Sequence, residues 1–231
     1  MDFGRTYTKM PKTTQKSSAV LTRGYFPGLF AAVLALAGLA RATGNPAEKT
    51  LVFFGDSLTA GYGLADPAAE AYPALIQARI RAAGLPWRVV NAGLSGETTA
   101  GGLRRIDWTL RTPPDLFVLG LGANDGLRGI SPTLMRSNLE EIIERVRRRQ
   151  PAARIVLAGM QMPPELGPEH AAAFGRVFPE VAKKTGVTLI PFLLEGVGGV
   201  AELNQGDRIH PNPAGHAIMA DTVWKILRPL L

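Results

Sequence analysis

The sequence contains no cysteine, and only three of its 231 residues are histidines. The absence of cysteine excludes disulfides, cysteine-ligated zinc, iron–sulfur clusters and a thiol nucleophile. A zinc site made of histidines alone would need all three of them. Aromatic residues make up only 7% of the chain, but hydrophobic residues together make up 46%, which is enough for a buried core. The length suits one domain.

The formal net charge of +7 is unevenly distributed along the chain. Residues 1–42 contain six basic residues and one acidic residue, whereas residues 43–231 contain 20 basic and 18 acidic residues. A sequence pI near 10 would by itself suggest a nucleic-acid partner. Because the excess of positive charge lies in the N-terminal segment, we expect no nucleic-acid partner.

Residues 1–42 have the pattern of an export signal. A basic region precedes the uncharged apolar stretch 26–40, and Ala40-Arg41-Ala42 fits the A-x-A cleavage pattern. The apolar stretch is shorter than the ~20 residues that comfortably span a bilayer. We therefore predict a signal peptide over residues 1–42 and a periplasmic or secreted bacterial domain over residues 43–231, with no stable membrane association after cleavage. An uncleaved N-terminal membrane anchor is the alternative.

Strand and helix patterns alternate from residue 50 to the C-terminus. Continuous apolar runs predict buried strands, and apolar residues at helical spacing predict helices. The predicted strands cover residues 51–54, 88–90, 116–121, 154–157 and 187–190, and the predicted helices cover residues 71–83, 98–110, 137–150, 171–184 and 214–227. This alternation predicts a three-layer α/β/α sandwich with a mostly parallel central sheet. In such folds the functional groups lie beyond the carboxyl ends of the strands.

Two sequence clusters place candidate catalytic residues at that edge of the sheet. Ser57, in the sequence GDSL, follows the first predicted strand, and Asp207 and His210 precede the last predicted helix. A serine nucleophile needs a base that accepts its proton, and the imidazole needs an acid that holds its tautomer. Taken alone, each cluster is also typical of an ordinary turn. The G-x-S-x-G motif of α/β-hydrolases does not occur in the sequence.

Two further residues follow predicted strands and supply hydrogen-bond donors. Gly96 follows the second strand, and its lack of a Cβ lets an acyl group approach its backbone N–H closely. Asn124 follows the third strand, and its amide can donate to an oxyanion without adding charge. In isolation, each is equally typical of a turn. Together with Ser57, Asp207 and His210, they complete a set of groups for acyl transfer.

The order of these clusters resembles that of the SGNH (GDSL) hydrolase family. Its four blocks occur here as GDSL at 55–58, Gly96, GAND at 122–125 and DRIH at 207–210. The stretches GDSLTAGYGL, NAGLSGETTAGGL and GANDGLRG are most similar to the group of bacterial periplasmic thioesterase I/lysophospholipase L1 enzymes, also described as arylesterases. The resemblance runs from about residue 50 to the C-terminus and implies a flavodoxin-like form of the sandwich.

The resemblance implies a role for each matched residue. Ser57 is then the nucleophile, His210 the general base and later acid, and Asp207 the carboxylate that orients the imidazole. The oxyanion hole consists of the N–H groups of Ser57 and Gly96 together with the Asn124 amide. The family needs neither a metal nor an organic cofactor, and we expect none here. We also expect a monomer.

The remaining acids and histidines near these blocks receive structural interpretations. Asp56 and Asp125 adjoin catalytic positions, and we interpret both as acids that hold the local turns. His216 lies in a predicted helix, where packing or a surface position is the simpler explanation, and His170 has no assigned role.

The resemblance also indicates where a substrate would lie. In the resembling group, the acyl chain occupies a groove between the loops after the third and fourth strands. The corresponding positions imply contacts from Leu127, Arg128, Met160, Met162 and Pro163. Methionine offers an adaptable apolar wall, although ordinary cover over the sheet explains the two methionines equally well.

The predicted function is therefore a serine ester hydrolase that acts on small acyl esters, thioesters or lysophospholipids. A carbohydrate O-acetylesterase is one alternative, because the same four blocks serve that chemistry, but the apolar segment 160–162 argues against it. The other alternative is a membrane-anchored lipid-binding module without catalysis. Its weakness is that a binding module has no need of all five catalytic groups.

Overall fold

A single five-stranded sheet forms the centre of the protein, in a computed structural model that describes residues 47–163, 165 and 167–231. All four strand pairings are parallel, and the strand order is β2-β1-β3-β4-β5. The strands are β1 (Lys49–Gly55), β2 (Trp87–Gly93), β3 (Leu116–Gly120), β4 (Arg154–Ala158) and β5 (Thr188–Ile190). The predicted α/β sandwich with a parallel sheet is confirmed.

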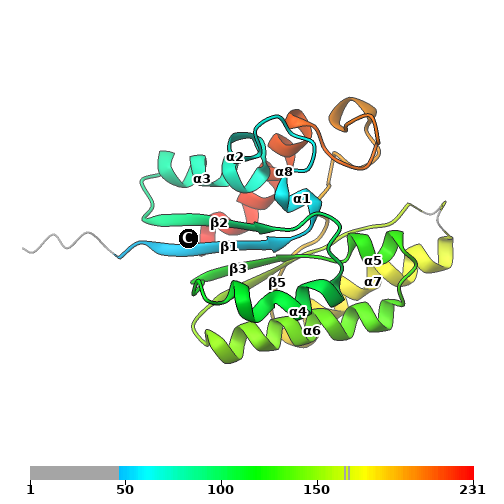
Figure 1. Cartoon of the computed structure of the whole chain (residues 1–231), viewed down its shortest axis with the longest axis horizontal. Coiled ribbons are helices and arrows are strands. Elements are labelled where there is room, and N and C mark those ends of the chain that lie inside the picture. Colours follow the sequence, from blue (N-terminus) through cyan, green and yellow to red (C-terminus); the bar gives the residue numbers. More distant parts are fainter. Residues whose placement is uncertain (1–46, 164, 166) are drawn as a thin grey trace, which may run out of the picture. The chain divides into compact units, whose positions relative to one another are not determined.

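Helices cover both faces of the sheet (Figure 1). One layer contains α2 (Pro67–Glu70), α3 (Tyr72–Ala82) and α8 (Pro213–Leu227), and the other contains α4 (Thr99–Thr109), α6 (Pro132–Arg149) and α7 (Pro168–Thr185). Two short helices, α1 (Ser57–Ala60) and α5 (Ala123–Leu127), directly follow β1 and β3, and the 3₁₀ turns η2 (Ala201–Leu203) and η3 (Arg228–Leu230) flank α8. Because both faces are covered, every residue of β3 is buried, as its apolar sequence predicts.

Most element boundaries lie within two residues of the predicted ones, and the differences are larger at the starts of α6 and α7 and at the end of β2. Helix α6 begins at Pro132 rather than at residue 137, because proline is favoured in the first turn, where its missing N–H costs nothing. Strand β2 continues to Gly93, whereas the predicted strand ends at residue 90. The Asn91 side chain donates to Thr59 O at 2.8 Å and accepts from Gly93 N at 2.9 Å, so it links the strand to α1.

The carboxyl edge of the sheet is shaped for close approach of α1. Gly55 lies in register with Gly93 of β2 and Gly120 of β3. A Cβ on Gly55 would collide with the Thr59 side chain and lie 2.8 Å from Gly120 O. Only glycine therefore lets α1, which begins with Ser57, rest directly on the ends of the strands.

The predicted signal peptide and the boundary after residue 42 lie outside the described residues. The described part belongs to one compact unit, residues 44–231. Within that part, we find no helix whose length and apolar content would let it cross a membrane.

Candidate active site

Ser57 is the first residue of α1 and lies immediately beyond the carboxyl end of β1. The helix starts here because Asp56 caps it: Asp56 Oδ1 accepts from Leu58 N at 3.1 Å. Strand and cap together hold the serine at the sheet edge, where functional groups of parallel α/β folds gather.

Ser57, His210 and Asp207 form a continuous hydrogen-bonded chain. Ser57 Oγ lies 3.0 Å from His210 Nε2, and His210 Nδ1 lies 2.6 Å from Asp207 Oδ2. The structure thus brings together three residues that the sequence analysis selected from two distant segments. Both distances are within hydrogen-bonding range for a nucleophile, a base and an orienting acid.

The loop that carries Asp207 fixes its carboxylate with backbone donors. Asp207 Oδ1 accepts from Ile209 N at 2.9 Å and from His210 N at 3.0 Å. These bonds, with the one from the imidazole, lower the pKa of Asp207 to about 2. The carboxylate is therefore charged at every pH near neutrality and can stabilise a protonated imidazole.

Tyr62 is a neighbour of the imidazole that the sequence motifs do not reveal. Its ring centroid lies 4.6 Å from that of His210, at an interplanar angle of 47°. The segment that carries it is tied to the catalytic loop, because Gln205 Nε2 donates to Tyr62 O at 2.7 Å. The Tyr62 ring therefore packs against the imidazole.

Gly96 lies in the loop between β2 and α4 with a φ of +78°. This left-handed conformation favours glycine. A Cβ at this position would have one neighbour, the Arg128 guanidinium, at an ordinary contact distance of 3.6 Å. Glycine is therefore favoured here by the backbone conformation and not by a lack of space. Arg128 Nη2 donates to Gly96 O at 3.0 Å and thereby links the end of α5 to this loop.

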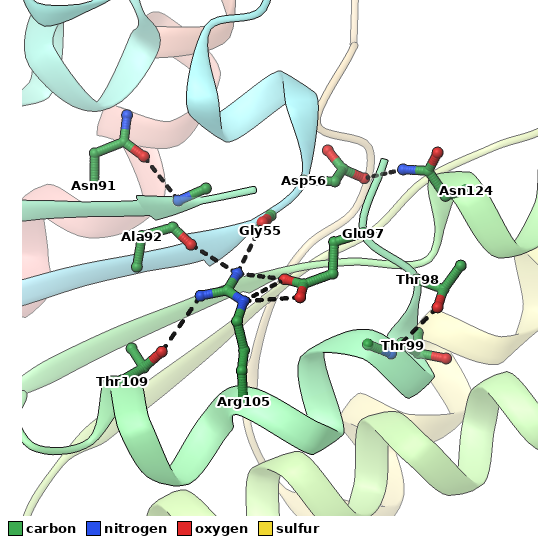
Figure 2. Close-up of polar contacts among 12 residues, drawn as sticks. Gly55, Asp56, Asn91, Ala92, Glu97, Thr98, Thr99, Arg105, Thr109 and Asn124 are labelled. Atoms are coloured by element: carbon green, nitrogen blue, oxygen red, sulfur yellow. Dashed lines mark hydrogen bonds and ion pairs between the residues drawn. The ribbon is translucent and has the colours of Figure 1, made fainter. Parts of the chain in front are cut away.

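Asn124, in the first turn of α5, contacts the side chain of Asp56, the residue before Ser57. Asn124 Nδ2 lies 3.4 Å from Asp56 Oδ2, a long hydrogen bond that Figure 2 shows at the upper right. The amide group has two hydrogens, so this contact leaves one for another acceptor. Asp56 thus orients Asn124 as well as capping α1, a contact that the sequence could not reveal.

Burial raises the pKa of Asp56 to about 6, although the bond from Leu58 N, the charge of His210 and the Asn124 amide all lower it. Only 2% of Asp56 is exposed. A buried carboxylate beside the nucleophile costs stability once it ionises. Its contact with Asn124 supplies a reason for such a group to occur at this position.

Two backbone N–H groups complete the cluster. Ser57 N is the first N–H of α1, which has no partner inside a helix, and Gly96 N lies outside regular structure. Within the described part of the chain, neither N–H donates a backbone hydrogen bond. Both are free to donate to a bound oxygen, as an oxyanion hole requires.

The five residues implied to contact substrate fall into two groups. Leu127 and Arg128 end α5 beside the Gly96 loop, and both are exposed. Met160 is buried, Met162 is partly buried, and Pro163 is exposed. The two methionines line an open groove of about 600 Å³ against α7, together with Ala171, Ala172, Gly175, Pro179, Leu189 and Pro191. None of the five catalytic candidates lines that groove.

Asp125 and the two other histidines form their hydrogen bonds with groups outside the catalytic set. Asp125 is buried and accepts from Thr99 N at 2.8 Å and from Thr99 Oγ1 at 2.6 Å, which ties α5 to α4. His170 Nε2 contacts Gly126 O at 3.2 Å. His216 is buried in α8, and its Nδ1 accepts from Tyr72 N at 3.2 Å. No group of three potential metal ligands is present among the described residues.

The buried imidazole of His216 gives a prediction about acid stability. Burial lowers its pKa to about 4, whereas an unfolded histidine titrates near 6.5. Between these values the unfolded chain binds the extra proton, so the free energy of unfolding falls as the pH is lowered from 6.5 to 4. We expect His216→Asn, which keeps an acceptor for Tyr72 N, to lack this loss of roughly 3 kcal/mol. Urea unfolding at pH 4.5, 5.5, 6.5 and 7.5 measures it.

The matched control for this experiment is His170→Asn, which removes a partly buried histidine on α7 and leaves His216 in place. This variant keeps His216, so its unfolding free energy should still fall as the pH is lowered from 6.5 to 4. If the wild type and His216→Asn give parallel curves, His216 does not oppose folding in acid.

Comparisons with known proteins give a consistent result. The model of the GDSL-like lipase/acylhydrolase family matches residues 53–218. Esterase TesA of Pseudomonas aeruginosa is 42% identical over 190 residues, which is 82% of this chain and 92% of that protein. Thioesterase 1/protease 1/lysophospholipase L1 of Escherichia coli K12 is 36% identical over 186 residues, covering 80% and 86% respectively. A crystal structure of TesA, 43% identical, superposes with a TM-score of 0.75 over 79% of this chain and 100% of its own.

Proposed function

The chain belongs to the GDSL-like lipase/acylhydrolase family and is an SGNH-type ester hydrolase, and on this basis we propose that it cleaves acyl esters through an acyl-enzyme on Ser57. The observation that carries this proposal is the 3.0 Å contact between Ser57 Oγ and His210 Nε2. Asp207, held ionised by its hydrogen bonds, is the third member of the set.

In the first half of the proposed reaction, Ser57 Oγ attacks the carbonyl carbon while His210 Nε2 takes the hydroxyl proton. The carbonyl oxygen becomes an oxyanion, which accepts from Ser57 N, Gly96 N and Asn124 Nδ2. The bond to the leaving group then breaks, and His210 returns the proton to the departing alcohol or thiol. Water repeats the sequence on the acyl-enzyme, and the carboxylic acid leaves.

The side chains at the site support an apolar acyl or aryl substrate. Four large hydrophobic residues with about half of their surface exposed lie close in sequence to the catalytic candidates: Tyr62, Leu94, Leu127 and Ile209. Exposed apolar side chains grouped near a site suggest an apolar ligand. They support carboxylic esters and thioesters with acyl chains, including lysophospholipids, rather than acetylated carbohydrates.

The setting of the reaction is proposed from the sequence. The basic and apolar N-terminal segment supports export to the periplasm or beyond, with cleavage after residue 42. The mature domain then acts as a monomer on small molecules, without stable attachment to a membrane.

The proposed function is tested with residues 43–231 and a series of p-nitrophenyl esters from acetate to palmitate. We expect turnover with an optimum beyond acetate, and a fluorophosphonate probe should label Ser57 and no other residue. An optimum at acetate would favour the carbohydrate O-acetylesterase. A folded protein that neither turns over an ester nor reacts with the probe would leave only the lipid-binding alternative.

A further inference from the structure

A buried ion pair lies directly behind the Gly96 loop. Arg105, on α4, donates from Nε to Glu97 Oε1 at 2.8 Å and to Glu97 Oε2 at 2.7 Å, and its Nη2 also contacts Oε2 (Figure 2). The Glu97 side chain is 4% exposed and that of Arg105 21%. Glu97 immediately follows Gly96, so the pair anchors the loop to the body of α4.

The same guanidinium also binds the ends of two strands. Arg105 Nη2 donates to Ala92 O in β2 at 2.9 Å and to Gly55 O in β1 at 3.3 Å. The charged group lies over the Phe54 ring, 4.1 Å from its centroid. One side chain therefore contacts the last residue of β1, the end of β2 and the residue after Gly96.

One backbone oxygen, that of Gly55, connects the turn that carries Ser57 to the loop that carries Gly96. Gly55 O accepts from Leu94 N at 2.9 Å as well as from Arg105, and the loop closes through Glu97 N to Leu94 O at 3.1 Å. Gly55 lies two residues before Ser57, and Leu94 lies two residues before Gly96. The position of Gly96 N relative to Ser57 N thus depends on the contacts of Arg105 with Gly55 O and with Glu97.

Stability alone does not explain a buried pair of this kind. The cost of removing two charges from water offsets their attraction, so well-packed apolar residues in the same place are often equally stable. Apolar residues would not supply directional hydrogen bonds. Arg105 donates such bonds to Gly55 O, to Ala92 O and to the Glu97 carboxylate.

We propose that Glu97 and Arg105 are positioning residues for the oxyanion hole, which hold Gly96 N at the distance from Ser57 that the transition state requires. The inference rests on the proposed roles of Ser57 and Gly96. Oxyanion donors act only within a few tenths of an ångström of their proper place, so a shifted loop lowers kcat without weakening substrate binding.

The principal test is the double variant Glu97→Leu/Arg105→Met in the full chain, because it replaces the pair by apolar groups and avoids an unpaired buried charge. We expect kcat for p-nitrophenyl butyrate to fall about 10- to 100-fold, with KM within twofold of wild type. Affinity for a trifluoromethyl ketone, which forms an oxyanion on the serine, should fall by the same factor as kcat/KM. Titration with a fluorophosphonate counts the competent molecules, so that kcat refers to folded enzyme.

Arg105→Lys is the second variant and keeps the charge opposite Glu97. Lysine lacks the planar fork that reaches both strand ends, so kcat should again fall with KM unchanged. The matched control is Asp107→Asn, which breaks another ion pair on α4, the 3.0 Å contact with Arg145. Its kcat should stay within twofold of wild type.

The outcomes separate this inference from the proposed function. If the wild type is active and kcat per titrated site in both variants stays within twofold of it, the positioning role is wrong. The role is equally wrong if KM rises while kcat is unchanged, or if ketone affinity is unaffected. A wild type without turnover and without fluorophosphonate labelling overturns the proposed function and this inference together.

Discussion

We expect the Ser57→Ala variant to lose about 10⁴- to 10⁶-fold in kcat for p-nitrophenyl butyrate, because the reaction then has no covalent nucleophile. The substitution removes a single oxygen atom. In the wild type, and among the described residues, the Ser57 hydroxyl forms a side-chain hydrogen bond only with the His210 imidazole. The fold should therefore be unchanged, and thermal unfolding of the two proteins should coincide within a few degrees.

The residual rate of Ser57→Ala is informative as well. The donors Ser57 N, Gly96 N and Asn124 Nδ2 remain in place, so the variant should still exceed the uncatalysed rate. Ser137→Ala, which removes an exposed serine on α6, serves as the matched control and should retain full activity. A Ser57→Ala protein with more than a tenth of the wild-type kcat would show that another group attacks the ester.

We expect His210→Asn to lower kcat to a similar extent, about 10⁴- to 10⁶-fold, because the asparagine amide cannot accept the Ser57 proton. The double variant Ser57→Ala/His210→Asn should be no slower than either single variant, since the two groups act as one unit. Steady-state rates of all three variants on one substrate make the comparison.

His216→Asn is the control for His210→Asn, because it makes the same replacement six residues further along the chain. His216 bonds to Tyr72 N and not to the reacting groups, so its kcat at pH 7.5 should stay within twofold of wild type. Multiplicative losses in the double variant would show that Ser57 and His210 act independently, against the proposed mechanism.

The sequence predicts the fold well where the pattern is long and periodic. The fully buried β3 and the amphipathic α6 follow from apolar spacing, and the largest error in their bounds is the start of α6, at a proline that begins the helix. Helices α1 and α5 escape prediction because four or five residues hold no helical period. Their positions depend on contacts with the sheet edge rather than on local pattern.

In the candidate site, too, the sequence predicts the residues within each local motif but not the contacts between residues far apart in the chain. Ser57, Asp207 and His210 are recognisable by residue type, and the structure adds the distances between them. The contacts of Asp56 with Asn124 and of Arg105 with Gly55 join residues 68 and 50 positions apart. No spacing rule encodes such pairs, since they depend on how the loops meet after the sheet has formed.

The contact between Ser57 and His210 spans 153 positions, almost the whole of the described chain. The bonds from Tyr72 N to His216 and from Trp87 Nε1 to Leu231 O, each across 144 positions, likewise join the first half of the domain to its last helix and terminus. Contacts between such distant segments carry the largest loop-closure cost during folding. A chain whose C-terminal part is still being synthesised, or one cut short before residue 207, therefore contains Ser57 but neither Asp207 nor His210. Under the proposed mechanism, the domain gains its activity only when the loop that carries Asp207 and His210 has docked beside Ser57.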